Sequence, residues 1–155
     1  MTSRIIWRAY VARTAACGLA IGLSSVVASG ECPITSASYW MASPDSAAIF
    51  SGIARQVQDG GTAVQVVTFD VERVWKGALP KRVTLYQLNT SEAIAFSAGA
   101  RYVIVAVRET DSERERFRIS QPANMLSITP CGSRLFEEAE RLGELRELGP
   151  GRLPN

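Results

Sequence analysis

Few side chains in this 155-residue sequence could take part in catalysis. There is no His, which excludes Ser-His and Cys-His nucleophile pairs and any His-ligated metal site, and three Cys cannot form a four-Cys zinc site. Asp70 and Glu72 lie on one face of a predicted strand and could act as coupled carboxylates, but the polar outer face of a strand explains them better. We therefore predict a protein that is not an enzyme, with no catalytic residue, no metal and no cofactor.

The Trp75-Lys76-Gly77 element is a second candidate, because β-barrels of the OB type stack nucleic acid bases on such aromatic residues. The competing interpretation, which we favour, is a Trp packed in the core or at its rim, a solvated Lys and a Gly in a turn. The formal net charge of +2 is too small to indicate a nucleic acid partner. Arginines alternate with glutamates over 113–118, which predicts a solvated hairpin with cross-strand pairs rather than a basic strip.

The first 28 residues have the features of a secretory signal peptide. Arginines and no acidic residue precede an uncharged, mostly small or apolar run from Thr14 to Ala28, and cleavage is expected after Ala28 or after Gly30. An uncleaved membrane anchor is the alternative, but a run of about 15 residues is shorter than the roughly 20 that span a bilayer. We therefore expect a secreted or periplasmic protein of the cell envelope, with no stable membrane anchor after cleavage.

Cleavage changes both the charge and the cysteine count. Removing three of the 17 basic residues and no acidic one leaves 14 basic against 15 acidic residues, a net charge of −1. Cys17 is removed as well, so Cys32 and Cys131 form one candidate disulfide in an oxidising compartment. Such a bond would close a loop of about 100 residues, worth up to ~4–5 kcal/mol in the chain-entropy model. Two separate buried thiols are the alternative.

Past an irregular segment over 29–46, the hydropathy pattern predicts a β-rich body. Gly52 falls in the middle of the first strand and indicates a bulge or bend. Residues 101–107 are apolar on both faces, which predicts a central strand. The predicted strands cover 47–57, 63–75, 82–88, 101–107, a short segment near 117–120 after a charged loop over 109–118, and an extended segment over 125–129.

The strand predicted over 63–75 has the clearest alternation of apolar and polar residues. Apolar side chains of one parity are expected to face the core, and they are Val67, Phe69, Val71 and Trp75. A strand of this length usually bends, which is typical of a barrel or a sandwich.

The end of the chain predicts a helix over 133–148, with Ser133 as its N-cap and leucines at helical spacing. Gly149-Pro150 ends this helix, and residues 150–155 form a tail. The predicted fold is mainly β: an OB-like, five-stranded, partly open antiparallel β-barrel with a C-terminal amphipathic helix, formed by residues 47–149.

Short motifs in this sequence resemble, in their order along the chain, those of a known family. They are Phe50-x-Gly52, Trp75-Lys76-Gly77, Phe96-x-x-Gly99-x-x-Tyr102, and Cys131-Gly132 ahead of a terminal helix. From about Cys32 to Leu148 the chain is similar to bacterial relatives of the tissue inhibitors of metalloproteinases (TIMP), within the broader netrin-module family. The resemblance implies an OB-like barrel with flanking helices, in which most of the motif residues have structural roles.

The resemblance also implies a non-catalytic module that binds an extracytoplasmic protein, with a protease as the leading candidate. In the animal inhibitors an N-terminal Cys chelates the zinc of the protease, which requires Cys to be residue one. Both expected cleavage sites leave Glu31 ahead of Cys32, so we do not carry inhibition over. The candidate partner-binding residues are Cys32, Pro33, Trp75 and Tyr102. The alternative function is a small-ligand or structural module of the cell envelope that uses the barrel mouth near Trp75 and Tyr102.

Overall fold

The structure of this protein, a computed structural model, describes residues 36–61 and 63–155. The predicted signal peptide, Cys32 and Pro33 lie outside the described residues. Within those residues the elements follow one another as α1 (Ala37–Ala42), β1 (Ser46–Asp59), β2 (Val64–Lys76), β3 (Arg82–Leu88), β4 (Arg101–Val107), α2 (Asp111–Arg116), β5 (Ser127–Ile128), β6 (Arg134–Leu135), α3 (Phe136–Arg141) and α4 (Glu144–Leu148).

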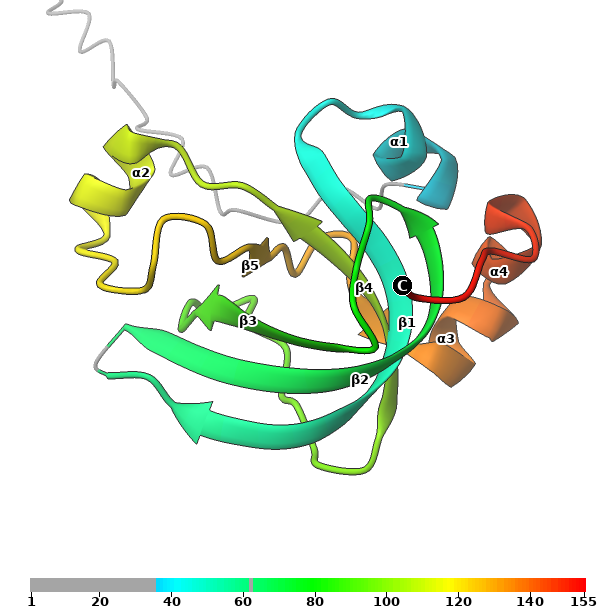
Figure 1. The fold of residues 1–155 in the computed structure, drawn as a ribbon, viewed down its shortest axis with the longest axis horizontal. Helices are drawn as coiled ribbons and strands as arrows, with labels where there is room; N and C mark the ends of the chain where they lie inside the picture. Colours follow the sequence, from blue (N-terminus) through cyan, green and yellow to red (C-terminus); the bar gives the residue numbers. More distant parts are fainter. Residues whose placement is uncertain (1–35, 62) are drawn as a thin grey trace, which may run out of the picture.

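Strands β1 to β5 close into a barrel (Figure 1). They pair in the order β1-β2-β3-β5-β4, and β4 returns to pair with β1. All of these pairs are antiparallel except β3 with β5, which is parallel through Tyr86 and Ser127. The predicted mainly β, OB-like fold is confirmed. The barrel is closed and mixed, rather than partly open and wholly antiparallel, because β5 bridges β3 to β4.

The predicted strand boundaries agree closely with the structure. The ranges 82–88 and 101–107 coincide with β3 and β4, and the first two strands differ by no more than two residues at either end. Strand β4 pairs with β1, β5 and β6, which confirms the central place that its apolar faces predicted. The extended segment over 125–129 contains β5.

Strands β1 and β2 bend around the barrel through irregular pairing. Two of the irregularities leave an extra residue on β2, at Glu72 and at Trp75, and the register shift beside Gly52 confirms the predicted bend. Each extra residue changes which parity faces inward, so that Val74 lies in the core at 1% exposed. Trp75 does not share the buried face of Val67, and the prediction that it does was wrong.

Aromatic rings fill the inside of the barrel. Phe50 and Phe69 meet edge-to-face at 5.6 Å between ring centroids, and Phe96 lies 5.6 Å from Phe69 and 4.8 Å from Tyr102. The hydroxyl of Tyr102 accepts a hydrogen bond from the backbone N–H of Ser97 at 2.8 Å, which satisfies its polar end. The rings therefore form a packed core.

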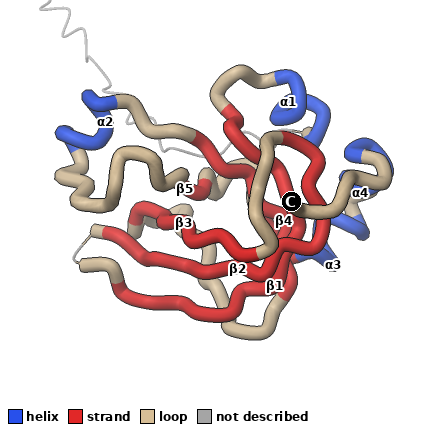
Figure 2. Tube along the Cα trace, viewed as in Figure 1, coloured by secondary structure: helices blue, strands red, loops and turns tan. Residues whose placement is uncertain are grey.

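Helices α1, α3 and α4 lie outside the strands on one side, and α2 lies on the other (Figure 2). Helix α1 begins at the N-cap Ser36, so the segment predicted as irregular over 29–46 contains a helix. Trp40 of α1, Ile49 of β1 and Leu148 of α4 line a small cavity between the helices and the barrel wall. Gly132 allows this close packing, because a Cβ there would lie 2.6 Å from Nε1 of Trp40.

Lys76 fixes the end of α1 to the barrel. Its Nζ donates to the carbonyl oxygens of Ser43 at 2.5 Å and of Trp40 at 3.4 Å, and to Oγ of Ser46 at 2.7 Å. The last carbonyls of a helix lack partners within the helix, and a Lys in this place satisfies them. The predicted solvated Lys is therefore wrong: Lys76 is half-buried and bound to the segment that follows α1.

The charged segment after β4 forms helix α2, so the predicted loop with a strand near 117–120 and a hairpin was wrong. Thr110 and Glu113 make a capping box, in which Oγ1 of Thr110 accepts from the N–H of Glu113 and the Glu113 carboxylate accepts from the N–H of Thr110. This reciprocal pair satisfies two donors at the start of the helix and makes the helical turn more favourable than the alternating charges suggest.

The helix predicted over 133–148 is interrupted. The Ser133 hydroxyl bonds the backbone N–H and carbonyl of Val105 instead of capping a helix, and β6 follows it directly. Gly143, at φ +80°, then separates α3 from α4. An ion pair between Arg134 and Glu144, 3.0 Å long and largely buried, holds α4 to β6.

We expect Gly52→Ala to destabilise the fold by about 1–3 kcal/mol, the usual cost of overpacking. A Cβ at this position would lie 2.7 Å from the backbone oxygen of Asp70, and backbone atoms cannot give way as a flexible side chain can. Urea unfolding measures the loss, and Gln58→Ala, at an exposed position of the same strand, is the control. A variant as stable as the parent would contradict the close approach.

We expect Lys76→Met to release α1 while the barrel stays folded, with a loss of about 1.5–3 kcal/mol from a charge-assisted hydrogen bond. Amide hydrogen exchange in 37–46 should accelerate more than exchange in β3 or β4. Lys81→Met serves as the control, because Lys81 is exposed and lies directly before β3. Unchanged protection of α1 would show that Lys76 does not hold it.

Candidate functional site

Trp75 and Tyr102 were predicted as candidate partner-binding residues and, for the alternative function, as residues near the mouth of the barrel; the structure places one inside the core and the other outside it. Tyr102 is 1% exposed and lies among the core rings. Trp75 lies outside the core, where its Nε1 donates to the carbonyl oxygen of Gly149 at 2.9 Å and its ring packs against Gly151. Trp75 therefore fixes the tail to the barrel, and neither side chain forms an open mouth for a ligand.

The other motif residues lie in the core or at positions where the backbone packs closely or has a positive φ. Gly77, at φ +78°, lies where a Cβ would be 2.5 Å from the backbone oxygen of Ala47. Phe50 and Phe96 belong to the core, and Gly99, at φ +88°, ends the loop that leads into β4. These contacts explain the motif residues by packing and backbone conformation.

Cys131 is half-buried and lies just before Gly132, which packs against α1. Its predicted partner Cys32 lies outside the described residues, and so does Pro33. The disulfide and the partner-binding roles of Cys32 and Pro33 therefore remain predictions.

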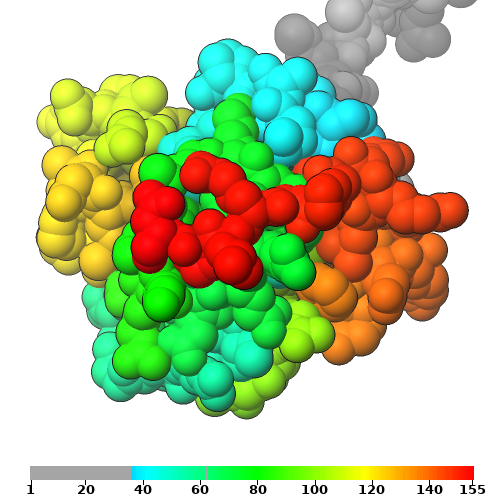
Figure 3. All heavy atoms as spheres, turned by 45° about the vertical axis from the view of Figure 1, so that its right-hand side comes forward, coloured from blue at the N-terminus to red at the C-terminus, as the bar shows by residue number. Residues whose placement is uncertain are grey.

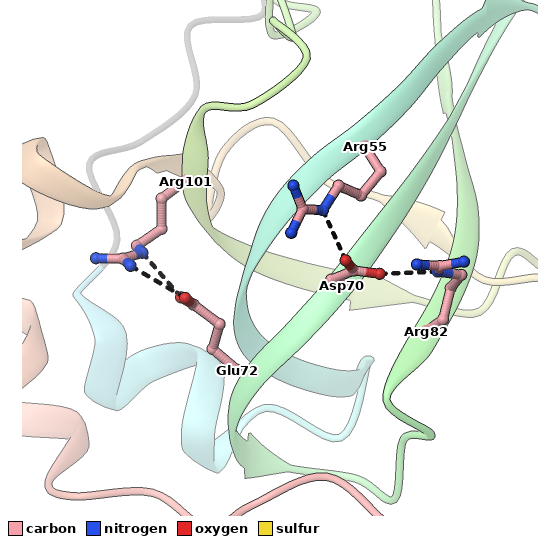
Figure 4. Close-up of polar contacts among 5 residues, drawn as sticks. All are labelled: Arg55, Asp70, Glu72, Arg82 and Arg101. Carbon is pink, nitrogen blue, oxygen red and sulfur yellow. Dashed lines mark hydrogen bonds and ion pairs between the residues drawn. The ribbon is translucent and has the colours of Figure 1, made fainter.

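The most developed polar surface lies on the outer side of β1, β2 and β3 and extends to Arg101 at the start of β4. We call it the arginine face, and it consists of Arg55, Asp70, Glu72, Lys81, Arg82 and Arg101. Asp70 lies between two arginines: Nε of Arg55 is 2.6 Å from Oδ2 and Nε of Arg82 is 2.8 Å from Oδ1 (Figure 4). Each of these three neighbouring strands thus contributes one residue to a charged triplet. The pairing of β2 with β3 places Asp70 opposite Arg82.

The second ion pair of the face joins β4 to β2, and its arginine also contacts α3. Arg101 of β4 binds the Glu72 carboxylate through Nε at 2.8 Å and through Nη2 at 3.0 Å. Its guanidinium also lies 5.1 Å from the ring centroid of Phe136 in α3. Glu72 is the extra residue of a β2 bulge, so the bulge positions this carboxylate.

The two arginine contacts lower the pKa of Asp70, with the hydrogen bond from Arg82 as the largest cause and that from Arg55 as the next. The same contact raises the pKa of Arg82. The ionised form of Asp70 is therefore favoured next to the two guanidinium groups.

A hollow of about 690 Å³ adjoins the arginine face. Val71, Lys81 and Arg82 line one side, and Leu153 and Pro154 of the tail line the other. The tail, red in Figure 3, crosses the green strands in the view of that figure and leaves its side chains at the surface. Leu153 is 71% exposed, so a large apolar side chain stands open to solvent beside positive charges.

A second, acidic region lies between α1, α2 and the end of β4. Two adjoining hollows of about 340 and 310 Å³ share Val107, Glu109, Glu113 and Thr129. Partial burial raises the pKa of Glu109, and the nearby Glu113 acts in the same direction, whereas a hydrogen bond from Ser127, 2.5 Å long, opposes the shift. The charge of Arg114 also lowers the pKa of Glu109, and Arg108 lines the larger of the two hollows beside the carboxylates.

The fold and the surface define a class: a closed, side-chain-filled OB-like barrel that presents charged outer faces. No family model and no curated protein matches this chain. Among residues 36–61 and 63–155, no three Cys, Asp or Glu side chains gather in a way that could hold a metal ion. In the same part of the chain, no helix is long and apolar enough to cross a membrane.

We expect Glu109→Gln to be more stable than the parent at pH 7. Folding raises the pKa of Glu109 above its usual value of 4.5, so the parent loses stability as the pH rises through the folded pKa. Below the unfolded pKa both states are protonated, and the advantage of the variant should disappear at about pH 4. Urea unfolding of the parent and the variant at both pH values measures the difference in their free energies of unfolding. An equal difference at the two pH values would contradict the raised pKa of Glu109.

Proposed function

We propose that this protein is an exported, non-catalytic module that binds another protein through the outer surface of its barrel. The observation that carries the proposal is the filled interior, where Phe50, Phe69, Phe96 and Tyr102 occupy the space that a ligand-binding barrel leaves open. Binding must then use the outside, where an open apolar side chain lies beside charged groups.

Export is supported by the sequence of the first 28 residues, with its basic start and apolar run. The proposed location is the periplasm, the cell envelope or the medium, with no stable membrane anchor after cleavage. An oxidising location also suits the proposed Cys32–Cys131 disulfide, which would join the start of the mature chain to the segment before β6.

The proposed partner is an extracytoplasmic protein, and a protease is the leading candidate through the resemblance to the TIMP-like, netrin-module family. Direct zinc chelation by that family's route requires Cys32 to be the first residue of the mature chain. A nucleic acid partner is not proposed, because the mature chain carries a net charge of −1.

A small-ligand or structural module of the envelope is the second candidate. The hollow beside the tail favours it, since its volume of about 690 Å³ lies in the range of small-molecule sites. A ligand of this kind would be recovered with the purified exported protein, whereas a protein partner would be recovered as a second chain.

Intact mass of the exported protein tests the export part of the proposal. We expect a chain that begins at Ser29 or at Glu31 and gains the mass of two hydrogens on reduction. A chain that retains residues 1–28 would contradict cleavage, and a mass unchanged by reduction would contradict the disulfide.

Photo-crosslinking in cells tests protein binding itself. A benzoylphenylalanine is placed at Thr84 on the outer side of β3, at Thr90 beside the acidic hollows, or at Glu140 on α3, all of them exposed positions. We expect a discrete protein adduct at one or more positions that survives high salt during purification. The absence of any adduct at all three positions, with normal export, would contradict the proposed function.

A further inference from the structure

Arg55 and Arg82 bind Asp70 in a way that leaves the terminal nitrogens of both guanidinium groups without a hydrogen bond to it. Arg55 and Arg82 each contact Asp70 through Nε alone. Within the described residues, neither guanidinium makes a further hydrogen bond or ion pair, so Nη1 and Nη2 of both remain available. In Figure 4 the terminal nitrogens of Arg55 point away from the carboxylate of Asp70.

The charges of the face do not cancel. Glu72 is matched by Arg101, and one carboxylate, Asp70, stands against two arginines. Lys81 is exposed, lines the same hollow as Arg82 and has no ion-pair partner among the described residues. The face therefore holds a local excess of positive charge, although the expected mature chain is slightly negative overall. An anionic partner fits this excess.

Asp70 also prepares the two arginines for binding. A free Arg side chain loses conformational entropy when it is fixed by a ligand, and a side chain that is already held loses less. The terminal nitrogens of a guanidinium form a planar fork that matches a carboxylate in a bidentate pair. Two such forks, held by one internal carboxylate, are suited to acidic side chains arriving from outside.

The hollow adds an apolar contact to this site. Val71, Leu153 and Pro154 line it beside Lys81 and Arg82. The tail that carries Leu153 is fixed, because the N–H and carbonyl of Arg152 pair with those of Val74 at 2.9 and 2.8 Å, and the N–H of Asn155 donates to Leu79 at 3.0 Å. An apolar side chain next to an acidic one could therefore enter a preformed site.

We propose that the arginine face binds an acidic, partly apolar surface segment of the protein partner, with its carboxylates held by the terminal nitrogens of Arg55 and Arg82. This inference rests on the proposed function and specifies the chemistry of the partner. The apolar lining favours a peptide segment over a plain anion such as phosphate, because a phosphate would leave Leu153, which is 71% exposed, without a contact.

Binding of a defined probe tests the proposal with the full mature chain. The probe is a fluorescent peptide of alternating Asp and Leu, and its control is the same peptide with Asn in place of Asp. We expect the Asp peptide alone to bind, with affinity falling as salt rises. Arg55→Gln with Arg82→Gln should weaken binding by at least about tenfold, as expected for lost charge-assisted pairs.

Matched variants separate charge, shape and folding. Arg55→Lys with Arg82→Lys keeps the charge but removes the forks, and should weaken binding by a smaller factor. Arg141→Gln with Arg146→Gln removes two exposed charges from α3 and α4 and should bind as the parent does. Arg55 and Arg82 are themselves largely exposed, so their variants should unfold in urea close to the parent.

Three results would overturn the inference: equal binding of the Asp and Asn peptides, parental affinity in the double Gln variant, or tighter binding of inorganic polyphosphate than of the Asp peptide. Crosslinking at the three positions distinguishes failure of this inference from failure of the proposed function. Adducts at Thr90 or Glu140 without any at Thr84 would leave protein binding intact and overturn the arginine face as its site.

Discussion

The whole structure depends on β1 pairing with two strands, β2 along one edge and β4 along the other. A long strand can do this only if it bends, and the bend lies where Gly52 approaches the backbone oxygen of Asp70. The bulges opposite it on β2 then decide which side chains face inward. Val74 enters the core, whereas Glu72 and Trp75 are left outside, where one holds Arg101 and the other holds the tail.

Closure of the barrel also determines where function can reside. The interior is narrow enough for four aromatic rings to fill, and the helices on one outer side are fixed by Lys76 and by the Arg134–Glu144 pair. The outer face of β1, β2 and β3 is left for contact with other molecules. The same strand register that closes the barrel places Arg55, Asp70 and Arg82 side by side on that face.

The sequence predicts the strands well because period-2 patterns and turn residues act locally. It predicts the site poorly, because a bulge changes which residues of a strand face inward. An uninterrupted alternation would place Trp75 in the core, whereas the bulges of β2 place Val74 there. The arginine triplet depends on register between strands, which no local pattern contains. Two errors did have signals: Thr110-x-x-Glu113 is a capping box, and Gly143 interrupts the leucine pattern between α3 and α4.

The claim that binding uses the outer arginine face, and not the barrel interior, is tested most directly by NMR. Backbone amide shifts of the mature chain are followed as the Asp–Leu peptide is added. The account predicts changes concentrated in 53–56, 68–72, 81–84 and 152–154, with the amides of the loop 94–99, which carries Phe96 of the core, unchanged. Changes centred on 94–99 or on the acidic hollows near Glu109 would contradict it.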